Sequence, residues 1–226
     1  FNGASRSNLF SGDASDYILT FSKFASKRSL LTTTWYYLYS NPYFITRIIV
    51  LFMGDVCLEL FSRIRQFVCS VYPRLRRNLS YFVARAGANV VMREATTISL
   101  IGDIFSGKYN VIYATYMGYD EIAHHSGIRD WDAFYALNHL DKQFRQLNRS
   151  IYESGNNYHL VVLSDHGQSG GPTFKQKFGY TLEDLVSRNL PSNITVHSIL
   201  HSNDDHFYES LGLKKYRGNK DRIDDT

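Results

Sequence analysis

Four side chains in this sequence have the chemistry and the spacing that a divalent metal site requires. Asp120 and His124 lie four residues apart, and farther along the chain Asp165 and His166 are adjacent. Carboxylate oxygen and imidazole nitrogen both bind zinc at about 2.0–2.2 Å, and both also suit manganese or iron. The residue types therefore predict a metal centre, with zinc as the first candidate and manganese as the alternative.

Each of these pairs follows a strand-like run. Val111–Met117 is rich in β-branched and aromatic residues, and Leu160–Ser164 is apolar up to its last residue, so both predict buried strands. Between them, apolar residues at intervals of three and four predict an amphipathic helix; they are Phe134, Leu137, Leu140, Phe144, Leu147 and Ile151. Strand, helix and strand form a βαβ unit with parallel pairing, and ligands bind beyond the carboxyl ends of such strands.

Each pair alone also has an ordinary structural explanation. If a helical turn follows the first strand, Asp120 and His124 share one face, but many surface helices carry such a pair. Asp165-His166-Gly167 could be a simple Asx turn. The two pairs on successive parallel strands are more specific than either one alone.

The remaining histidines receive weaker predictions. His125 cannot share the direction of its neighbour, so we expect it beside the site without binding a metal, or in solvent. His139 and His159 are expected to be structural. The last three histidines are expected in a polar loop, although one of them could complete a metal site; they are His197, His201 and His206.

Composition excludes some functional classes. The chain has 226 residues, 44% of them hydrophobic, which suffices for one large domain or two small ones with a sizeable core. A net charge of +4 does not indicate a nucleic-acid partner, and without a recognition helix or a stacking platform we expect no nucleic-acid-binding module. Cys57 and Cys69 lack metal-ligand spacing, and we predict buried free thiols, which favours a reducing compartment.

Basic residues cluster in one part of the chain. No acidic residue lies between Glu59 and Glu94, whereas seven arginines fall between positions 63 and 93; they are Arg63, Arg65, Arg74, Arg76, Arg77, Arg85 and Arg93. The first interpretation is a solvated helix face. The second is a surface that faces anionic lipid or a phosphorylated substrate.

The stretch from residue 35 to 61 is aromatic and aliphatic. A spanning helix needs about 20 mostly apolar residues, and here Arg47, Asp55 and Glu59 interrupt the run. We therefore expect an interfacial amphipathic helix or a helical hairpin that covers the site. Asn41-Pro42 predicts a turn before this helix, and Pro73 predicts its end or a kink.

The predicted fold class is α/β, with a mostly parallel sheet flanked by helices and a helical aromatic and basic insertion. Because the chain begins with Phe1 rather than Met, we expect a partial domain from a longer protein. Four parts are expected: a loop-rich part of the core with short strand pieces (1–34), a helical insertion or cap (35–107), an α/β metal-binding core (108–190) and a tail without assigned structure (191–226).

Two motifs carry a family resemblance. Gly118-Tyr-Asp-Glu-Ile-Ala-His-His-Ser-Gly127, followed by Leu163-Ser-Asp-His-Gly-Gln168, resembles the alkaline phosphatase superfamily. Within it, the chain is similar to bacterial hydrolases related to nucleotide pyrophosphatase/phosphodiesterases. Shorter matches are Ser7–Asp13, Thr173-Phe174, Phe178-Gly179 and Thr181–Leu185. The resemblance covers most of the chain and implies an alkaline-phosphatase-like fold.

The resemblance also implies a two-metal site. Asp120 and His124 would bind one ion, and Asp165 and His166 the other. The family supplies one further His from far downstream, and an upstream Asp and a Ser or Thr nucleophile that we expect before Phe1. Ser5 is a poor candidate for the nucleophile, because no strand-like run precedes it. This chain would then hold only half of a site.

The function implied is a metal-dependent hydrolase of phosphate esters, a phosphomonoesterase or phosphodiesterase, that acts through a covalent phospho-enzyme. The expected partners are two divalent ions, a phosphorylated small-molecule or lipid-like substrate and a membrane surface, in a cytoplasmic or membrane-associated bacterial protein. One alternative keeps the fold and changes the reaction to that of a sulfatase, phosphomutase or phosphonate hydrolase. Another is a non-enzymatic α/β domain that binds a membrane or a partner.

Overall fold

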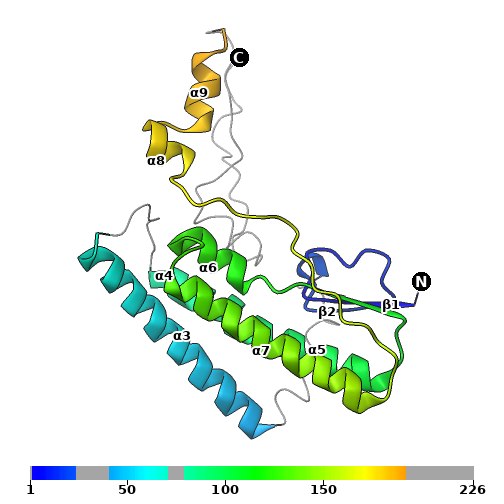
Figure 1. Cartoon of the computed structure of the whole chain (residues 1–226). Coiled ribbons are helices and arrows are strands. Elements are labelled where there is room, and N and C mark those ends of the chain that lie inside the picture. The colour runs from blue at the N-terminus through cyan, green and yellow to red at the C-terminus, as the bar shows by residue number, and fades with distance from the viewer. Residues whose placement is uncertain (1, 24–40, 71–78, 192–226) are drawn as a thin grey trace, which may run out of the picture.

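The computed structural model describes residues 2–23, 41–70 and 79–191, and Figure 1 shows a small sheet beside a layer of helices. The three parallel strands follow the order β2-β1-β3; their bounds are β1 Gly3–Arg6, β2 Asp16–Ile18 and β3 Val111–Ala114. This arrangement confirms the predicted α/β class with a parallel sheet, and also the short strand pieces expected near the start of the chain.

The predicted strand at Leu160–Ser164 is wrong, because this segment has no strand pairing and Leu163 is 80% exposed. β3 pairs with β1 instead, so the predicted βαβ unit does not form among the described residues. The strand predicted over Val111–Met117 forms only as far as Ala114, and Tyr113 on it is exposed rather than buried. A β-branched run favours extended backbone, but a strand also needs a partner edge, which local sequence does not supply.

Helix α3, Pro42–Val68, begins at the predicted turn. The Asn41 side chain accepts hydrogen bonds from the backbone N–H groups of Tyr43 and Phe44, and Pro42 occupies the first turn, where its missing N–H costs nothing. Within the described ranges, none of the helices has the length and apolarity needed to cross a membrane. Pro73 lies outside the described residues, and α3 ends before it.

The polar side of α3 is the buried side. Asp55, Glu59, Ser62 and Gln66 recur at intervals of three and four and are all buried. The predicted burial of Cys57 and Cys69 is wrong, because both thiols are exposed. The cause is the orientation of α3, which directs its hydrogen-bonding residues into the protein and its apolar residues outward.

A buried ionic network holds α3 against the other helices. Arg85 of α4 (Leu79–Ala86) pairs with Glu59, lies 3.5 Å from an Asp55 carboxylate oxygen, and lies 3.5 Å from Asp132 of α7 (Trp131–Ser154). The Ser62 hydroxyl donates to Asp132 at 3.2 Å. One guanidinium thus connects three helices in the interior, where charges require paired partners.

The arginine cluster is therefore divided between different environments. Arg85 and Arg93 are buried among acidic partners, so the interpretation of a solvated or lipid-facing surface is wrong for these two. Arg65 pairs with Asp130, and Arg63 is exposed. The remaining three, Arg74, Arg76 and Arg77, lie outside the described residues.

A second layer connects α3 and α4 to the sheet. The π-helix η2 (Gly87–Met92) leads into α5 (Arg93–Ser106). α5 packs on β1 and β3 on one side and on α7 on the other, with Leu100, Ile104 and Leu147 at its core. Arg6 of β1 donates two hydrogen bonds to the Asp103 carboxylate of α5, at 2.7 and 2.9 Å.

The amphipathic helix predicted from Phe134 to Ile151 is α7, and it ends at the left-handed Gly155.

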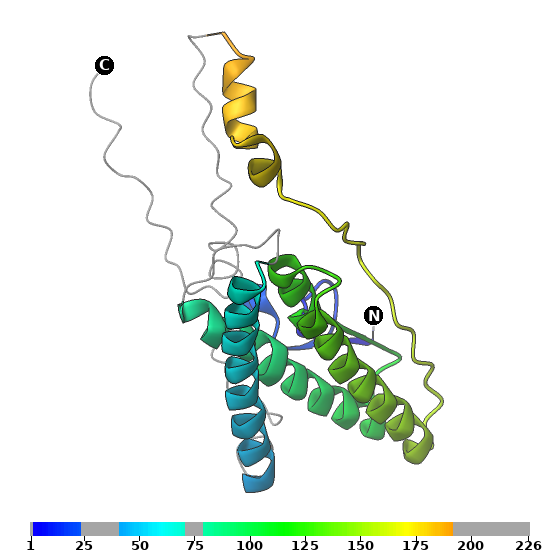
Figure 2. The same cartoon turned by 60° about the vertical axis from the view of Figure 1, so that its left-hand side comes forward.

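The short helices α8 (Phe174–Phe178) and α9 (Leu182–Arg188) bury no residue and project away from the other helices (Figures 1 and 2). At α9 the Thr181 side chain and backbone bond reciprocally with Asp184, which forms a capping box. The predicted domain divisions stay predictions.

Arg85→Met should destabilise the protein severely. The substitution leaves the buried carboxylates around Arg85 without their cation, which should cost about 3–5 kcal/mol in the free energy of unfolding measured with urea. The control is Arg145→Met, because Arg145 pairs with Asp141 at 2.8 Å on the exposed side of α7 and should lose less than about 1 kcal/mol. Equal losses for the two variants would contradict the assigned role of the network.

His139 should make the fold sensitive to acid. Burial, with Arg93, Lys142 and Arg47 as further causes, lowers the pKa of His139 to about 4. The unfolded chain then takes up the proton first, so stability should fall as pH drops from about 6.5 towards 4. His139→Gln should remove roughly 1 kcal/mol of this loss, after allowance for solvent screening. Identical slopes of unfolding free energy against pH would contradict the assignment.

Candidate metal centre

The helix that carries the first predicted pair is fixed at both ends. α6, Gly118–Ser126, follows β3 after three residues. A side chain at Gly118 would place its Cβ 2.8 Å from the Asn89 Cα of η2, so only glycine permits this close approach. At the other end, the Ser126 hydroxyl donates to Asp132 at 2.7 Å. The acid that pairs with Arg85 therefore also positions α6.

Asp120 and His124 share one face of α6, as the helical spacing predicts. A carboxylate oxygen of Asp120 lies 3.3 Å from Nε2 of His124. Asp120 is in the first turn of the helix, where the exposed N–H groups favour negative charge. Both side chains are about half exposed, so an ion or a ligand can reach them from solvent.

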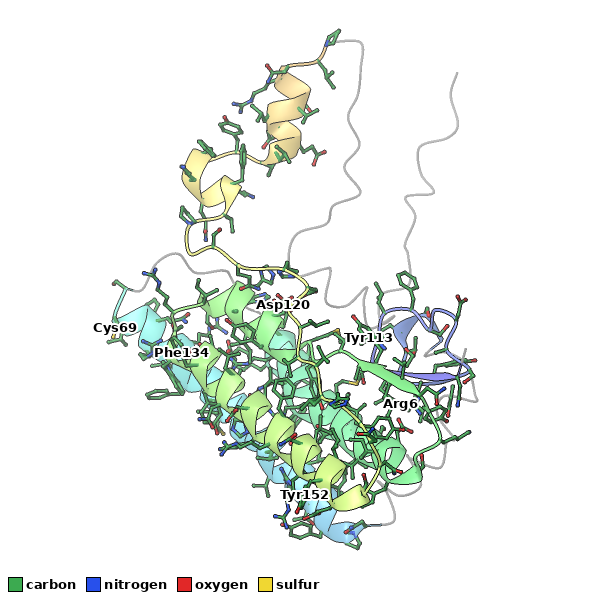
Figure 3. All side chains as sticks on the ribbon, turned by 45° about the vertical axis from the view of Figure 1, so that its right-hand side comes forward. Arg6, Cys69, Tyr113, Asp120, Phe134 and Tyr152 are labelled. Carbon is green, nitrogen blue, oxygen red and sulfur yellow. The ribbon has the colours of Figure 1, made fainter. Side chains whose placement is uncertain are left out.

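The chain beyond α7 brings a third donor to this pair. Nε2 of His166 lies 3.7 Å from the same Asp120 oxygen, and one ligand atom from each of Asp120, His124 and His166 falls within 4.8 Å of the other two. The Gln168 amide donates to Asp120 at 2.6 Å. Figure 3 shows Asp120 where the segment that leads to α8 passes α6. Residues far apart in sequence thus meet at one edge of the molecule.

Asp165 lies next to this group without joining it. Its side chain is 89% exposed, with one oxygen 3.8 Å from Nε2 of His166. The other oxygen accepts from the backbone N–H of His166 at 3.1 Å, which is the local turn contact that an Asp before His often makes. The structure therefore places three of the four predicted residues together, and their assignment as metal ligands stays a prediction.

The donor set of the three clustered residues fits a zinc ion. Two tetrahedral ligands at zinc distances are separated by about 3.4 Å, and His124 and His166 lie at 3.3 and 3.7 Å from Asp120. The Gln168 amide fixes the Asp120 carboxylate, as hydrogen bonds from neighbouring residues do for metal-binding carboxylates. An Asp–His pair four residues apart on a helix is also an ordinary ion pair. The assignment of a metal site therefore rests on the third donor, His166.

Other candidate residues lie elsewhere. His125 is buried and stacks on Tyr81 with ring centroids 4.3 Å apart, so the prediction of a place in solvent is wrong. Its Nδ1 contacts the backbone oxygen of Glu121 at 3.0 Å. Ser5 is buried in β1, and its hydroxyl accepts from the Asn8 amide at 2.7 Å. The three tail histidines lie outside the described residues.

An open cavity of about 850 Å³ adjoins the cluster, and His124 and His166 line it. Arg65 of α3, Trp131 of α7 and Gln176 of α8 contribute to its wall. Sequence reasoning assigned no role to Gln168, although it stands two residues after His166 in the motif.

The comparison with protein families identifies the class. The model of the type I phosphodiesterase/nucleotide pyrophosphatase family matches residues 40–221. The chain therefore belongs to this family and to the alkaline phosphatase superfamily, which confirms the resemblance found in its motifs. Membership supports hydrolysis of phosphate esters, and the family is generally metal-dependent. No curated protein and no solved structure matches the chain.

Zinc titration of the purified chain by calorimetry should test the cluster. His124→Ala and His166→Ala should each weaken zinc binding at least tenfold, because each removes a ligand atom. The matched control is His159→Ala, since His159 is exposed and belongs to no cluster among the described residues. Unchanged affinity in both ligand variants, or an equal loss in the control, would contradict the cluster.

Proposed function

We propose that this chain belongs to a metal-dependent phosphodiesterase or phosphomonoesterase that binds zinc through Asp120, His124 and His166. The convergence of these three donors beside an open cavity, in a member of a phosphodiesterase family, supports the proposal. Manganese is the alternative metal, because the same donors suit it. The substrate is proposed to be a phosphorylated small molecule or a lipid-like phosphate ester.

A divalent ion at this position would polarise the phosphoryl oxygens and offset the negative charge that grows during phosphoryl transfer. Asp120 and the two imidazoles would bind the ion, and the Gln168 amide would keep the carboxylate oriented towards it. The imidazoles must be neutral to bind, so metal affinity should fall in acid. Asp165, exposed beside His166, is proposed to contribute to a second ion.

The proposed reaction uses a Ser or Thr nucleophile and proceeds through a covalent phospho-enzyme. The hydroxyl oxygen attacks phosphorus as it gives up its proton, and the P–O bond to the leaving group breaks, so that the alkoxide departs and takes up a proton as the alcohol. Water then hydrolyses the enzyme–phosphorus ester and releases phosphate from a monoester substrate, or a phosphomonoester from a diester substrate. Ser5 is not proposed for this role, because its hydroxyl is buried and bonded to Asn8. Arg65 lines the cavity, where a guanidinium suits a phosphate group; it pairs with Asp130 in this structure.

The test is hydrolysis of bis(p-nitrophenyl) phosphate and p-nitrophenyl phosphate by the natural full-length protein. Activity on at least one substrate should fall by about 100-fold after chelation and return with zinc, because the metal supplies charge stabilisation that side chains cannot replace. Asp120→Asn should lower kcat by a similar factor, while His159→Ala should leave it unchanged.

Chelator-resistant activity that Asp120→Asn leaves intact would contradict the proposed function. Hydrolysis of p-nitrophenyl sulfate in preference to both phosphate esters would contradict the proposed substrate class while leaving the metal site standing. The two results are distinguishable. In the first, activity does not depend on Asp120, whereas sulfate hydrolysis at the metal site would still be lost in Asp120→Asn.

A further inference from the structure

Helix α3 exposes its apolar residues. We define the α3 stripe as the apolar residues on its outer side that are between 48% and 72% exposed: Ile49, Val50, Met53, Leu60, Phe61, Ile64, Phe67 and Val68. Their spacing of three and four places them along one side of the helix. Figures 1 and 2 both show α3 at the outside of the helical layer. A contiguous apolar surface of this kind indicates a partner.

Buried polar contacts fix the rotation of α3 about its own axis, so the α3 stripe cannot turn into the protein interior. The Gln66 amide donates to Asp130 at 2.9 Å, and the Asn89 amide donates to Asp55 at 2.7 Å. Glu59, fully buried, pairs with Arg85. Rotation of α3 would break these bonds and leave charges buried without partners, which costs several kcal/mol. The outward position of the stripe is therefore a stable feature of the fold.

The charges of α3 are distributed by sign. Its two acids, Asp55 and Glu59, are buried, whereas Arg47 and Arg63 are exposed. Arg47 also reaches Glu94 at 3.2 Å, and Arg63 lies over the Phe82 ring. The solvent side of α3 thus presents apolar residues and cations without a carboxylate. This combination complements anionic lipid headgroups above a hydrocarbon layer.

Aromatic residues continue the α3 stripe onto α7. The Phe61 ring lies 6.0 Å from Trp131 in an edge-to-face contact, and Trp131 lies 6.3 Å from Tyr135. Tryptophan and tyrosine favour the boundary between headgroups and hydrocarbon, because each has an apolar ring and a polar group. The opposite side of α3 is packed on protein, so lipid can meet this helix only from one side.

We propose that the α3 stripe docks in the plane of an anionic lipid bilayer, with Arg63 among the headgroups and Trp131 at the boundary. The geometry also relates this surface to the cavity, because Trp131 lines the cavity and contacts Phe61 of the α3 stripe. Docking would then hold the opening near the membrane. The membrane contact is independent of the proposed hydrolase function, and its failure would leave that function untouched.

The test is co-sedimentation of the full chain with phosphatidylcholine vesicles, alone or with about 30 mol % phosphatidylglycerol. The chain should bind the anionic vesicles. Val50→Ser/Met53→Ser/Ile64→Ser should bind at least tenfold more weakly, because it removes three side chains from the hydrocarbon contact. Arg63→Gln should reduce binding about fivefold, and only to the anionic vesicles.

The matched control replaces exposed apolar residues elsewhere. Tyr152→Ser/Leu182→Ser/Val186→Ser changes three exposed side chains on α7 and α9 and should bind like the unmodified chain. Thermal melts should be similar for all variants, since none of the positions is buried. Equal binding by the stripe variant and the control variant would overturn the proposal.

Two other occupants of the α3 stripe give different results. A second copy of this chain would produce a dimer in sedimentation equilibrium that the stripe variant dissolves, with no binding to vesicles. Coverage by another segment of the same chain would leave a monomer that binds no vesicles at all. Either result would overturn the membrane assignment.

Discussion

The buried ion pairs of Arg85 are the constraint on which the arrangement of helices depends. This guanidinium contacts acids from α3 and α7, and through Asp132 the same network reaches Ser126 at the end of α6. Removing such charges from water is expensive, so the network forms only when several partners are placed together. In this chain that requirement positions α6, and α6 carries Asp120 and His124.

The same constraint explains the unusual surface of α3. Because the helix directs Asp55 and Glu59 into the protein, its apolar residues face outward. The inward side of α3 holds the neighbouring helices in place through buried ion pairs. Its outward side presents the apolar residues of the α3 stripe, for which we propose a lipid partner. Arg65 of α3 and Trp131 of α7 line the cavity beside His124 and His166, and Trp131 also contacts Phe61 of the α3 stripe. The position of the candidate metal centre and the apolar surface of α3 therefore both follow from the burial of Asp55 and Glu59.

Sequence reasoning succeeded where the signal was local. The turn at Asn41-Pro42 and the period of the long helix depend on neighbours within one or two turns. It failed where the outcome depended on distant residues. Leu160–Ser164 has the composition of a strand but no pairing partner among the described residues, and the burial of Arg85 required acids from two other helices. The motifs identified Asp120, His124 and His166 as candidates, whereas only the structure connected Gln168 with Asp120.

X-ray absorption at the zinc edge of the zinc-loaded chain tests the central claim most directly. Coordination by Asp120, His124 and His166 predicts a first shell of nitrogen and oxygen at about 2.0–2.1 Å, with outer-shell scattering from two imidazole rings. His166→Ala should remove the signal of one ring. A first shell of sulfur at about 2.3 Å, contributed by the exposed Cys57 and Cys69, or a spectrum without imidazole scattering, would contradict the account.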